Sequence, residues 1–192
     1  MHLRSSRLAA AGVPKWRSQG SNGLWASHRA FGAEGLPIVL QMRTQAMEVV
    51  VFSGLQGAGK STWFAERYAQ THVRLSLDVL GTRNRETVLL HACLAVQQRV
   101  VVDNTNVTAS ARTRYALLAK AAGCSAVLVV FHVPTEVALA RNAQREGKAR
   151  VPDRAILGTA AKREDATWDE GFDRIIDVFE VDGERRTEER TR

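Results

Sequence analysis

Between residues 48 and 181 the chain alternates short apolar runs with longer segments of mixed polarity. The apolar runs predict strands over Glu48–Ser53, Val73–Leu77, Arg99–Asp103, Ala126–His132 and Ile175–Val181. Most of these runs are nearly continuous in Val, Ile, Leu and Phe, which is typical of parallel strands covered on both faces. The segments between them predict helices over Lys60–Gln70, Arg85–Gln98, Thr108–Ala122, Glu136–Glu146 and Asp153–Glu164. This order predicts an open α/β sheet with right-handed crossovers.

The two ends of the chain lack this pattern. Residues 1–47 show no sustained helical or strand period, are punctuated by Gly, Ser and Arg, and carry a net charge of +5. They predict a disordered basic extension, with an organellar transit peptide as the alternative, and Met42 and Met47 are alternative translation starts. We place the folded domain at residues 48–182 and expect the charged segment GERRTEERTR, residues 183–192, to be disordered.

Charge and cysteine usage narrow the class of protein. The formal net charge is +7, but the residues after 47 contribute only +2, so composition is weak evidence for a nucleic-acid partner. Cys93 and Cys124 have no C-x-x-C neighbour and the histidines are scattered singly, which favours a reducing, cytoplasmic compartment over a disulfide or zinc framework. No apolar run approaches the roughly 18 residues of a membrane span, so we expect a soluble protein.

The strongest motif follows the first predicted strand. The segment GLQGAGKS, residues 54–61, fits the G-x-x-x-x-G-K-[ST] pattern of a phosphate-binding loop and precedes a predicted helix, as that motif requires. In such a loop backbone N–H groups surround the phosphates, Lys60 reaches the β- and γ-phosphates, and the Ser61 hydroxyl binds Mg²⁺. We therefore predict ATP and Mg²⁺ as cofactors, with binding residues Gly54, Gln56, Gly57, Ala58, Gly59, Lys60, Ser61 and Thr62.

Two acids lie at the ends of the next two predicted strands. Ligands of open α/β sheets bind beyond the carboxyl ends of the strands, so Asp78 is expected to face the same crevice as the phosphate loop. There it would act as a general base for an acceptor hydroxyl, or as a helix N-cap. Asp103 is the expected second acid of the Mg²⁺ site. The polar residues Asn104, Thr105 and Asn106 would line an acceptor pocket or cap the following helix.

Arginines cluster near the predicted helix that follows the fourth strand. Arg141 and Arg145 are four residues apart, which places them on one helix face if the helix continues, and Arg150 follows the Gly147 interruption. Guanidinium groups that close over phosphates stabilise charge in the transition state. The alternative is a solvated basic face.

Taken together, these segments resemble the P-loop kinases related to the kinase domain of phage-type 5′-hydroxyl polynucleotide kinase. The resemblance rests on GLQGAGKSTWFAERY, LSLD, VVVDNTN and VPTEVALARNAQREGKARVP, spans residues 49–152, and continues loosely to Glu170–Asp173. It is closest to bacterial stand-alone members, usually described only as ATP-binding proteins. The combination of D-N-T-N with R-N-x-x-R-x-G-x-x-x-V-P is more specific than the phosphate loop alone.

The resemblance implies a role for each matching residue. It makes Lys60 and Ser61 ligands of ATP and Mg²⁺, Asp78 the general base, Asp103 a support for the loop and metal, and Arg145 the lid arginine. The polynucleotide kinases carry an arginine three residues after the base, where it grips the acceptor. This chain has Gly81 there, so Arg83 and Arg85 become the candidates for that contact.

The sequence therefore predicts a three-layer P-loop kinase-type fold with a five-stranded parallel sheet in the order 2-3-1-4-5. It predicts an ATP-dependent kinase that phosphorylates an acceptor hydroxyl, with a polynucleotide 5′-OH as the leading acceptor and a small metabolite or nucleoside as the next. A nucleotide-dependent switch that binds and slowly hydrolyses ATP is the rival class. A basic nucleic-acid-binding protein is a third class, which the near-neutral core disfavours.

Overall fold

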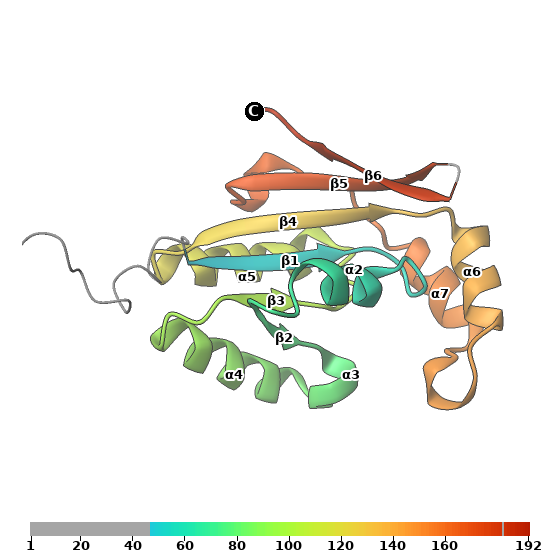
Figure 1. Ribbon diagram of the computed structural model, residues 1–192, viewed down its shortest axis with the longest axis horizontal. Coiled ribbons are helices and arrows are strands. Elements are labelled where there is room, and N and C mark those ends of the chain that lie inside the picture. The colour runs from blue at the N-terminus through green and yellow to red at the C-terminus, as the bar shows by residue number, and fades with distance from the viewer. Residues whose placement is uncertain (1–46, 182) are drawn as a thin grey trace, which may run out of the picture. The chain divides into compact units, whose positions relative to one another are not determined.

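The computed structural model describes residues 47–181 and 183–192, so the predictions for residues 1–46 lie outside the described part of the chain. A single six-stranded sheet in the order β2-β3-β1-β4-β5-β6 organises this part (Figure 1). The strands are β1 Glu48–Ser53, β2 Val73–Leu75, β3 Val100–Val102, β4 Ser125–His132, β5 Arg174–Val181 and β6 Glu184–Glu189. Strands β1 to β5 are parallel in the predicted order, which confirms the predicted fold class, and β6 adds an antiparallel edge.

The helices cover both faces of the sheet. They are α2 Lys60–Arg67, α3 Leu77–Leu80, α4 Arg83–Ala95, α5 Ala109–Ala121, α6 Thr135–Ala143 and α7 Asp153–Ala160, with short 3-10 turns η1 Gly147–Ala149 and η2 Trp168–Glu170. Every predicted helix is present with shifted ends, and the short α3 was not predicted. Alternate residues of β1 point to opposite faces, so Val49 and Val51 pack with α4 and α5, whereas Val50 and Phe52 pack with α2, α6 and α7.

The parallel arrangement brings the strand exits to one end of the sheet. In Figure 1 the arrows of β1 and β4 point toward the end at which α2, α3, α6 and α7 gather. Residues 49–52 of the central strand β1 are fully buried, because β1 is hydrogen-bonded to β3 on one side and β4 on the other. The phosphate loop therefore leaves from a buried strand that is paired on both sides.

The prediction of a disordered tail from residue 183 was wrong. Residues Glu184–Glu189 form β6, which pairs antiparallel with β5. A highly charged sequence is compatible with an edge strand because its side chains can reach solvent or pair with opposite charges on neighbouring elements. Arg174 of β5 pairs with Glu189, and Arg190 just beyond β6 pairs with Asp177 of β5.

Among the described residues, no helix combines the length and apolarity that a membrane crossing requires.

Candidate nucleotide site

The phosphate loop between β1 and α2 is held by close backbone packing. The Gly54 N–H donates to the Thr105 carbonyl at 2.8 Å, which ties the loop to the segment after β3. Gly57 has a φ of +82°, and a Cβ at this position would lie 2.9 Å from the Ala138 carbonyl of α6. Both the left-handed backbone and the close approach of α6 require glycine here.

Lys60 is a buried cation within this loop. Its ammonium donates to the carbonyls of Gly54 at 2.9 Å and Leu55 at 2.6 Å, and neither partner carries a charge. Burial lowers the pKa of Lys60 from 10.5 to about 8, while the nearby carboxylates of Asp103 and Asp78 raise it and the Arg145 guanidinium lowers it further.

Ser61 and Asp103 meet at the start of α2. The Ser61 hydroxyl donates to Oδ2 of Asp103 at 3.1 Å, and Asp103 is buried at the exit of β3. Arg74 of β2 donates to the same Oδ2 at 2.8 Å through Nε and to the Ser61 hydroxyl at 2.7 Å through Nη2. All the hydrogen bonds that the described residues make to the Asp103 carboxylate end on Oδ2, and none of them uses Oδ1.

Asp78 lies in the first turn of α3, directly beyond β2. Its side chain is exposed, and the N-cap position of the helix belongs to Ser76. No hydrogen bond of the Asp78 carboxylate is found among the described residues, so the capping alternative has no support there. The strand ends at Leu75, two residues earlier than predicted, because α3 already begins at Leu77.

A buried acid on α4 fixes the position of α3. Glu86 is fully buried; one oxygen accepts from the Asn104 amide at 2.6 Å and the other accepts from Arg83 at 3.1 Å and from the Tyr115 hydroxyl. The Asn104 oxygen in turn accepts from the Leu77 N–H at 2.9 Å. Burial and the neighbouring Glu86 raise the pKa of Tyr115 to about 12, which keeps it a donor. This chain of contacts sets the backbone immediately before Asp78.

The rest of the polar segment after β3 is also held from within the protein. The Asn106 amide donates to the Phe52 carbonyl at 2.9 Å, and the Ser53 hydroxyl donates to the Asn106 carbonyl at 3.0 Å. Thr108, rather than an asparagine, caps α5 by accepting from Ala111 N–H at 3.3 Å. The contacts of Asn104, Thr105 and Asn106 thus join the phosphate loop to the segment that carries Asp78.

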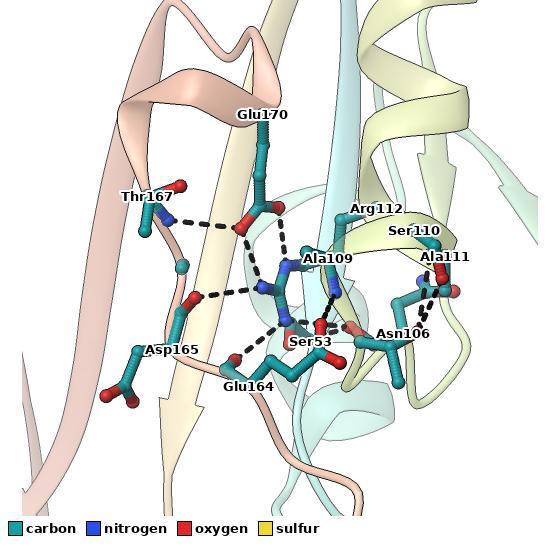
Figure 2. Close-up of polar contacts among 12 residues, drawn as sticks. Ser53, Asn106, Ala109, Ser110, Ala111, Arg112, Glu164, Asp165, Thr167 and Glu170 are labelled. Carbon is teal, nitrogen blue, oxygen red and sulfur yellow. Dashed lines mark hydrogen bonds and ion pairs between the residues drawn. The ribbon is translucent and has the colours of Figure 1, made fainter.

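A buried ion pair between Arg112 and Glu170 anchors the polar segment after β3 (Figure 2). Arg112 of α5 donates to both carboxylate oxygens of Glu170, at 2.7 and 2.6 Å, and to the Val107 carbonyl at 2.9 Å. It also donates to the carbonyls of Glu164 and Asp165. The guanidinium and the carboxylate are almost completely buried and fully engaged, which is the condition under which a buried pair is tolerated.

The two lid arginines of the sequence prediction do not share a helix face. Helix α6 ends at Ala143, so Arg145 lies beyond it. Arg141 donates to the Gly57 carbonyl at 3.4 Å and pairs with Glu180 of β5. Arg145 is exposed and lines a hollow of about 490 Å³ together with residues 146–147 and 150–152. Arg141 therefore contacts the loop directly, whereas Arg145 lines the neighbouring hollow.

The remaining predicted nucleotide contacts also lie in the loop. Gln56 donates to the Thr159 hydroxyl at 3.2 Å, while its buried Oε1 has no hydrogen-bond partner within the described part of the chain. Ala58 is buried and Thr62 is exposed at the start of α2. Gly59 precedes α2 in the left-handed conformation, and no side chain caps the helix.

The structure separates the two candidates for the acceptor-gripping arginine. Arg83 is occupied by Glu86 and the Tyr115 hydroxyl. Arg85 donates to the Leu80 carbonyl at 3.3 Å, and its Nη1 lies 3.8 Å from the position that a Cβ on Gly81 would take. The Arg85 guanidinium therefore occupies the space beside Gly81.

The residues present fit a magnesium nucleotide. An uncapped helix N-terminus, a glycine cradle and a buried ammonium without a carboxylate partner form a donor set for a polyphosphate. The adjacent Ser61 hydroxyl and Asp103 carboxylate are oxygen ligands of the kind that Mg²⁺ prefers. The site therefore has the chemistry to bind the nucleotide and its metal.

Sequence reasoning missed Arg74 and Glu86. The only signal for Arg74 is a charged residue inside a short apolar strand next to the loop. Glu86 looks like an ordinary helix residue in the sequence, and its importance depends on complete burial against Tyr115 and Asn104.

Comparison with known proteins identifies the fold. A family model described as an AAA domain matches residues 49–166. A sugar kinase from Janibacter sp. is similar with a TM-score of 0.50 and 19% identity over 69% of this chain and 85% of that chain. A structure of the PezAT toxin–antitoxin system of Streptococcus pneumoniae gives a TM-score of 0.50 and 13% identity, over 73% of this chain and 74% of that chain. Kti12 from Chaetomium thermophilum in complex with ADP-AlF3 gives a TM-score of 0.48 and 17% identity, over 66% of this chain and 86% of that chain.

Proposed function

Because the chain belongs to the AAA-domain family matched over residues 49–166 and has the P-loop kinase-type fold, we propose that it is an ATP-dependent phosphotransferase. The proposed reaction transfers the γ-phosphoryl group of MgATP to an acceptor hydroxyl. The observation that carries it is the phosphate loop, in which the buried Lys60 ammonium donates only to backbone carbonyls and the next residue, Ser61, contacts the Asp103 carboxylate. A cation, a metal-binding acid and an exposed carboxylate around one phosphate loop are the parts that phosphoryl transfer requires.

The nucleotide half of the reaction follows from the loop. When bound, MgATP supplies an activated phosphoryl group whose charge is shared with the metal. Lys60 holds the β- and γ-phosphates, the N–H groups at the start of α2 hold the phosphate chain, and Ser61 with Asp103 holds the metal. Arg145 stabilises negative charge as it develops on the transferring group. Arg74 fixes the Ser61–Asp103 pair in place.

The acceptor half is organised around Asp78. Its exposed carboxylate is free to take the proton of an acceptor hydroxyl, while the Glu86–Asn104–Leu77 contacts fix the backbone that carries it. Arg85, beside Gly81, is the side chain we propose to grip the acceptor. The resemblance to the polynucleotide kinases makes a polynucleotide 5′-OH the leading acceptor class, and a small metabolite or nucleoside is the next.

The decisive experiment separates proton transfer from nucleotide binding. Asp78→Asn keeps size and hydrogen-bonding ability but cannot accept the proton, so phosphoryl transfer should fall by about 10²- to 10⁴-fold. ATP affinity measured by calorimetry should stay within a few-fold of the wild-type protein. The matched control is Asp169→Asn, at an exposed acid on η2, which should change neither quantity.

Acceptors are found first, by screening phosphate transfer from labelled ATP to 5′-hydroxyl oligonucleotides, nucleosides and sugars. Transfer that survives Asp78→Asn within a few-fold would remove the proposed base and with it the mechanism. Slow ATP hydrolysis without any phosphorylated acceptor, unchanged in Asp78→Asn, would instead favour a nucleotide-dependent switch.

A further inference from the structure

Arg185 brings a positive charge from the C-terminal strand to the phosphate loop. It lies second in β6, opposite Glu180 of β5. Side chains alternate along a strand, and Arg185 is only a quarter exposed whereas its neighbour Arg186 is exposed. Strand β6 therefore directs one of its two adjacent arginines toward the protein and the other toward solvent.

The Arg185 guanidinium packs directly on the glycine that precedes Lys60. A Cβ at Gly59 would lie 2.7 Å from Nη2 of Arg185 and 3.4 Å from its Cζ, so the guanidinium occupies the space above this glycine. Its Nη1 donates to Glu66 at 3.1 Å, and its Cζ lies 5.9 Å from the centroid of the Trp63 ring. The guanidinium thus covers the first two turns of α2.

The start of α2 is an electrostatically unfavourable place for the Arg185 guanidinium when no anion is bound there. The N-terminus of a helix carries partial positive charge, and α2 has neither an acid in its first turn nor a side-chain cap. The Lys60 ammonium is a second cation at the same terminus. Among the residues that the structure describes, the acid that pairs with Arg185 is Glu66, whose side chain is half exposed, and such exposed pairs contribute little. An anion bound at the loop would relieve the repulsion among these charges.

A hollow adjoins the Arg185 guanidinium on the outer side of α2. Its volume is about 410 Å³, and it is lined by Glu66, Arg141, Glu180, Gly183 and Arg185. Arg141 also reaches the loop, through the Gly57 carbonyl. Two arginines from segments far apart in the sequence therefore lie against the phosphate loop, Arg141 at Gly57 and Arg185 at Gly59.

We propose that Arg185 is a nucleotide-binding residue that contacts the phosphate chain, which makes the C-terminal strand β6 part of the nucleotide site. On binding, the guanidinium exchanges the exposed Glu66 carboxylate for phosphate oxygens, to which its planar donors are well matched. The inference rests on the proposed nucleotide-binding function and adds a residue from outside the P-loop motif to it.

The test measures binding of ADP and of inorganic tripolyphosphate by calorimetry to the full chain. Arg185→Ala should weaken both by about 10- to 100-fold, the range for a lost hydrogen bond to a charged group. Arg186→Ala removes the same charge from the same strand on its exposed side, and should change affinity no more than a few-fold. Arg185→Lys keeps the charge without the planar fork and should fall between the two.

Thermal melting without ligand shows whether the variants fold. The Arg185–Glu66 pair is exposed, so Arg185→Ala and Arg186→Ala should melt close to the wild-type protein. Equal affinities in these two variants would overturn the proposal, as would tighter binding by Arg185→Ala, which would make Arg185 an obstacle. A loss for ADP without a loss for tripolyphosphate would overturn the phosphate assignment. If wild-type protein binds neither ligand, the proposed function itself fails.

Discussion

The buried ammonium of Lys60 predicts an unusual dependence of stability on pH. Burial lowers its pKa in the folded protein to about 8, against an ordinary value of 10.5. Between these two values the unfolded chain holds the proton and the folded protein releases it. Stability rises with pH wherever the unfolded state binds more protons, so Lys60 costs stability below pH 8 and this cost disappears as the pH rises.

The magnitude follows from the two pKa values. Raising the pH from about 7 to about 10 should increase the contribution of Lys60 to the free energy of unfolding by about 2.5 kcal/mol. Other groups titrate over the same range, so the quantity to measure is the difference between the wild-type protein and Lys60→Met. Urea unfolding of both proteins at each pH gives this difference, and the methionine variant should lose its relative advantage as the pH rises.

A difference in unfolding free energy that stays constant between these pH values would refute the argument, because it would mean that Lys60 keeps its ordinary pKa. The same residue gives a second readout. A bound polyphosphate restores the proton to Lys60, so ADP affinity should fall above about pH 8 by up to tenfold per pH unit, and binding there should take up a proton.

Two further predictions concern arginines. Arg145→Ala should lower kcat on the order of 10³-fold with a smaller change in KM for ATP, because the arginine charge acts on the transferring group. The control Arg154→Ala, at an exposed residue of α7, should leave kcat unchanged. A loss confined to KM in Arg145→Ala would contradict this role. Arg112→Leu leaves Glu170 buried without its partner and should cost about 3–5 kcal/mol in urea unfolding. Arg174→Ala, in an exposed pair, should cost under about 1 kcal/mol, and equal costs would contradict the argument from burial.

The parts of the fold that were predictable are those whose signal is local. The buried strands β1, β3 and β4 are nearly continuous apolar runs in the sequence, and the phosphate loop is a contiguous motif between a strand and a helix. The rule that ligands bind beyond the carboxyl ends of parallel strands predicts that Asp78 and Asp103 lie near the loop. Asp103 accepts a hydrogen bond from Ser61 of the loop motif, and Asp78 lies in the first turn of α3, directly after β2.

The parts that could not be predicted depend on pairing between distant segments. Strand β6 has the composition of a disordered tail, and its pairing with β5, with Arg174 facing Glu189 and Asp177 facing Arg190 just beyond the strand, involves residues that no local pattern connects. The sequence predicted that the helix after the fourth strand continues past Arg145, but α6 ends at Ala143. That helix end has no strong sequence signal. Glu86 acquires its role only through burial against a helix nearly thirty residues away in the sequence.

The sheet has two open margins within the described residues, and each is built in a way that limits self-association. An unpaired strand edge is a template for another chain, and proteins protect such edges with short strands or with charge. One edge strand is β2, which is short and spans only Val73–Leu75. At the other edge, β6 presents the sequence ERRTEE, in which every residue except the threonine is charged. The same strand that directs Arg185 to the phosphate loop is therefore also a charged edge strand that disfavours edge-to-edge aggregation.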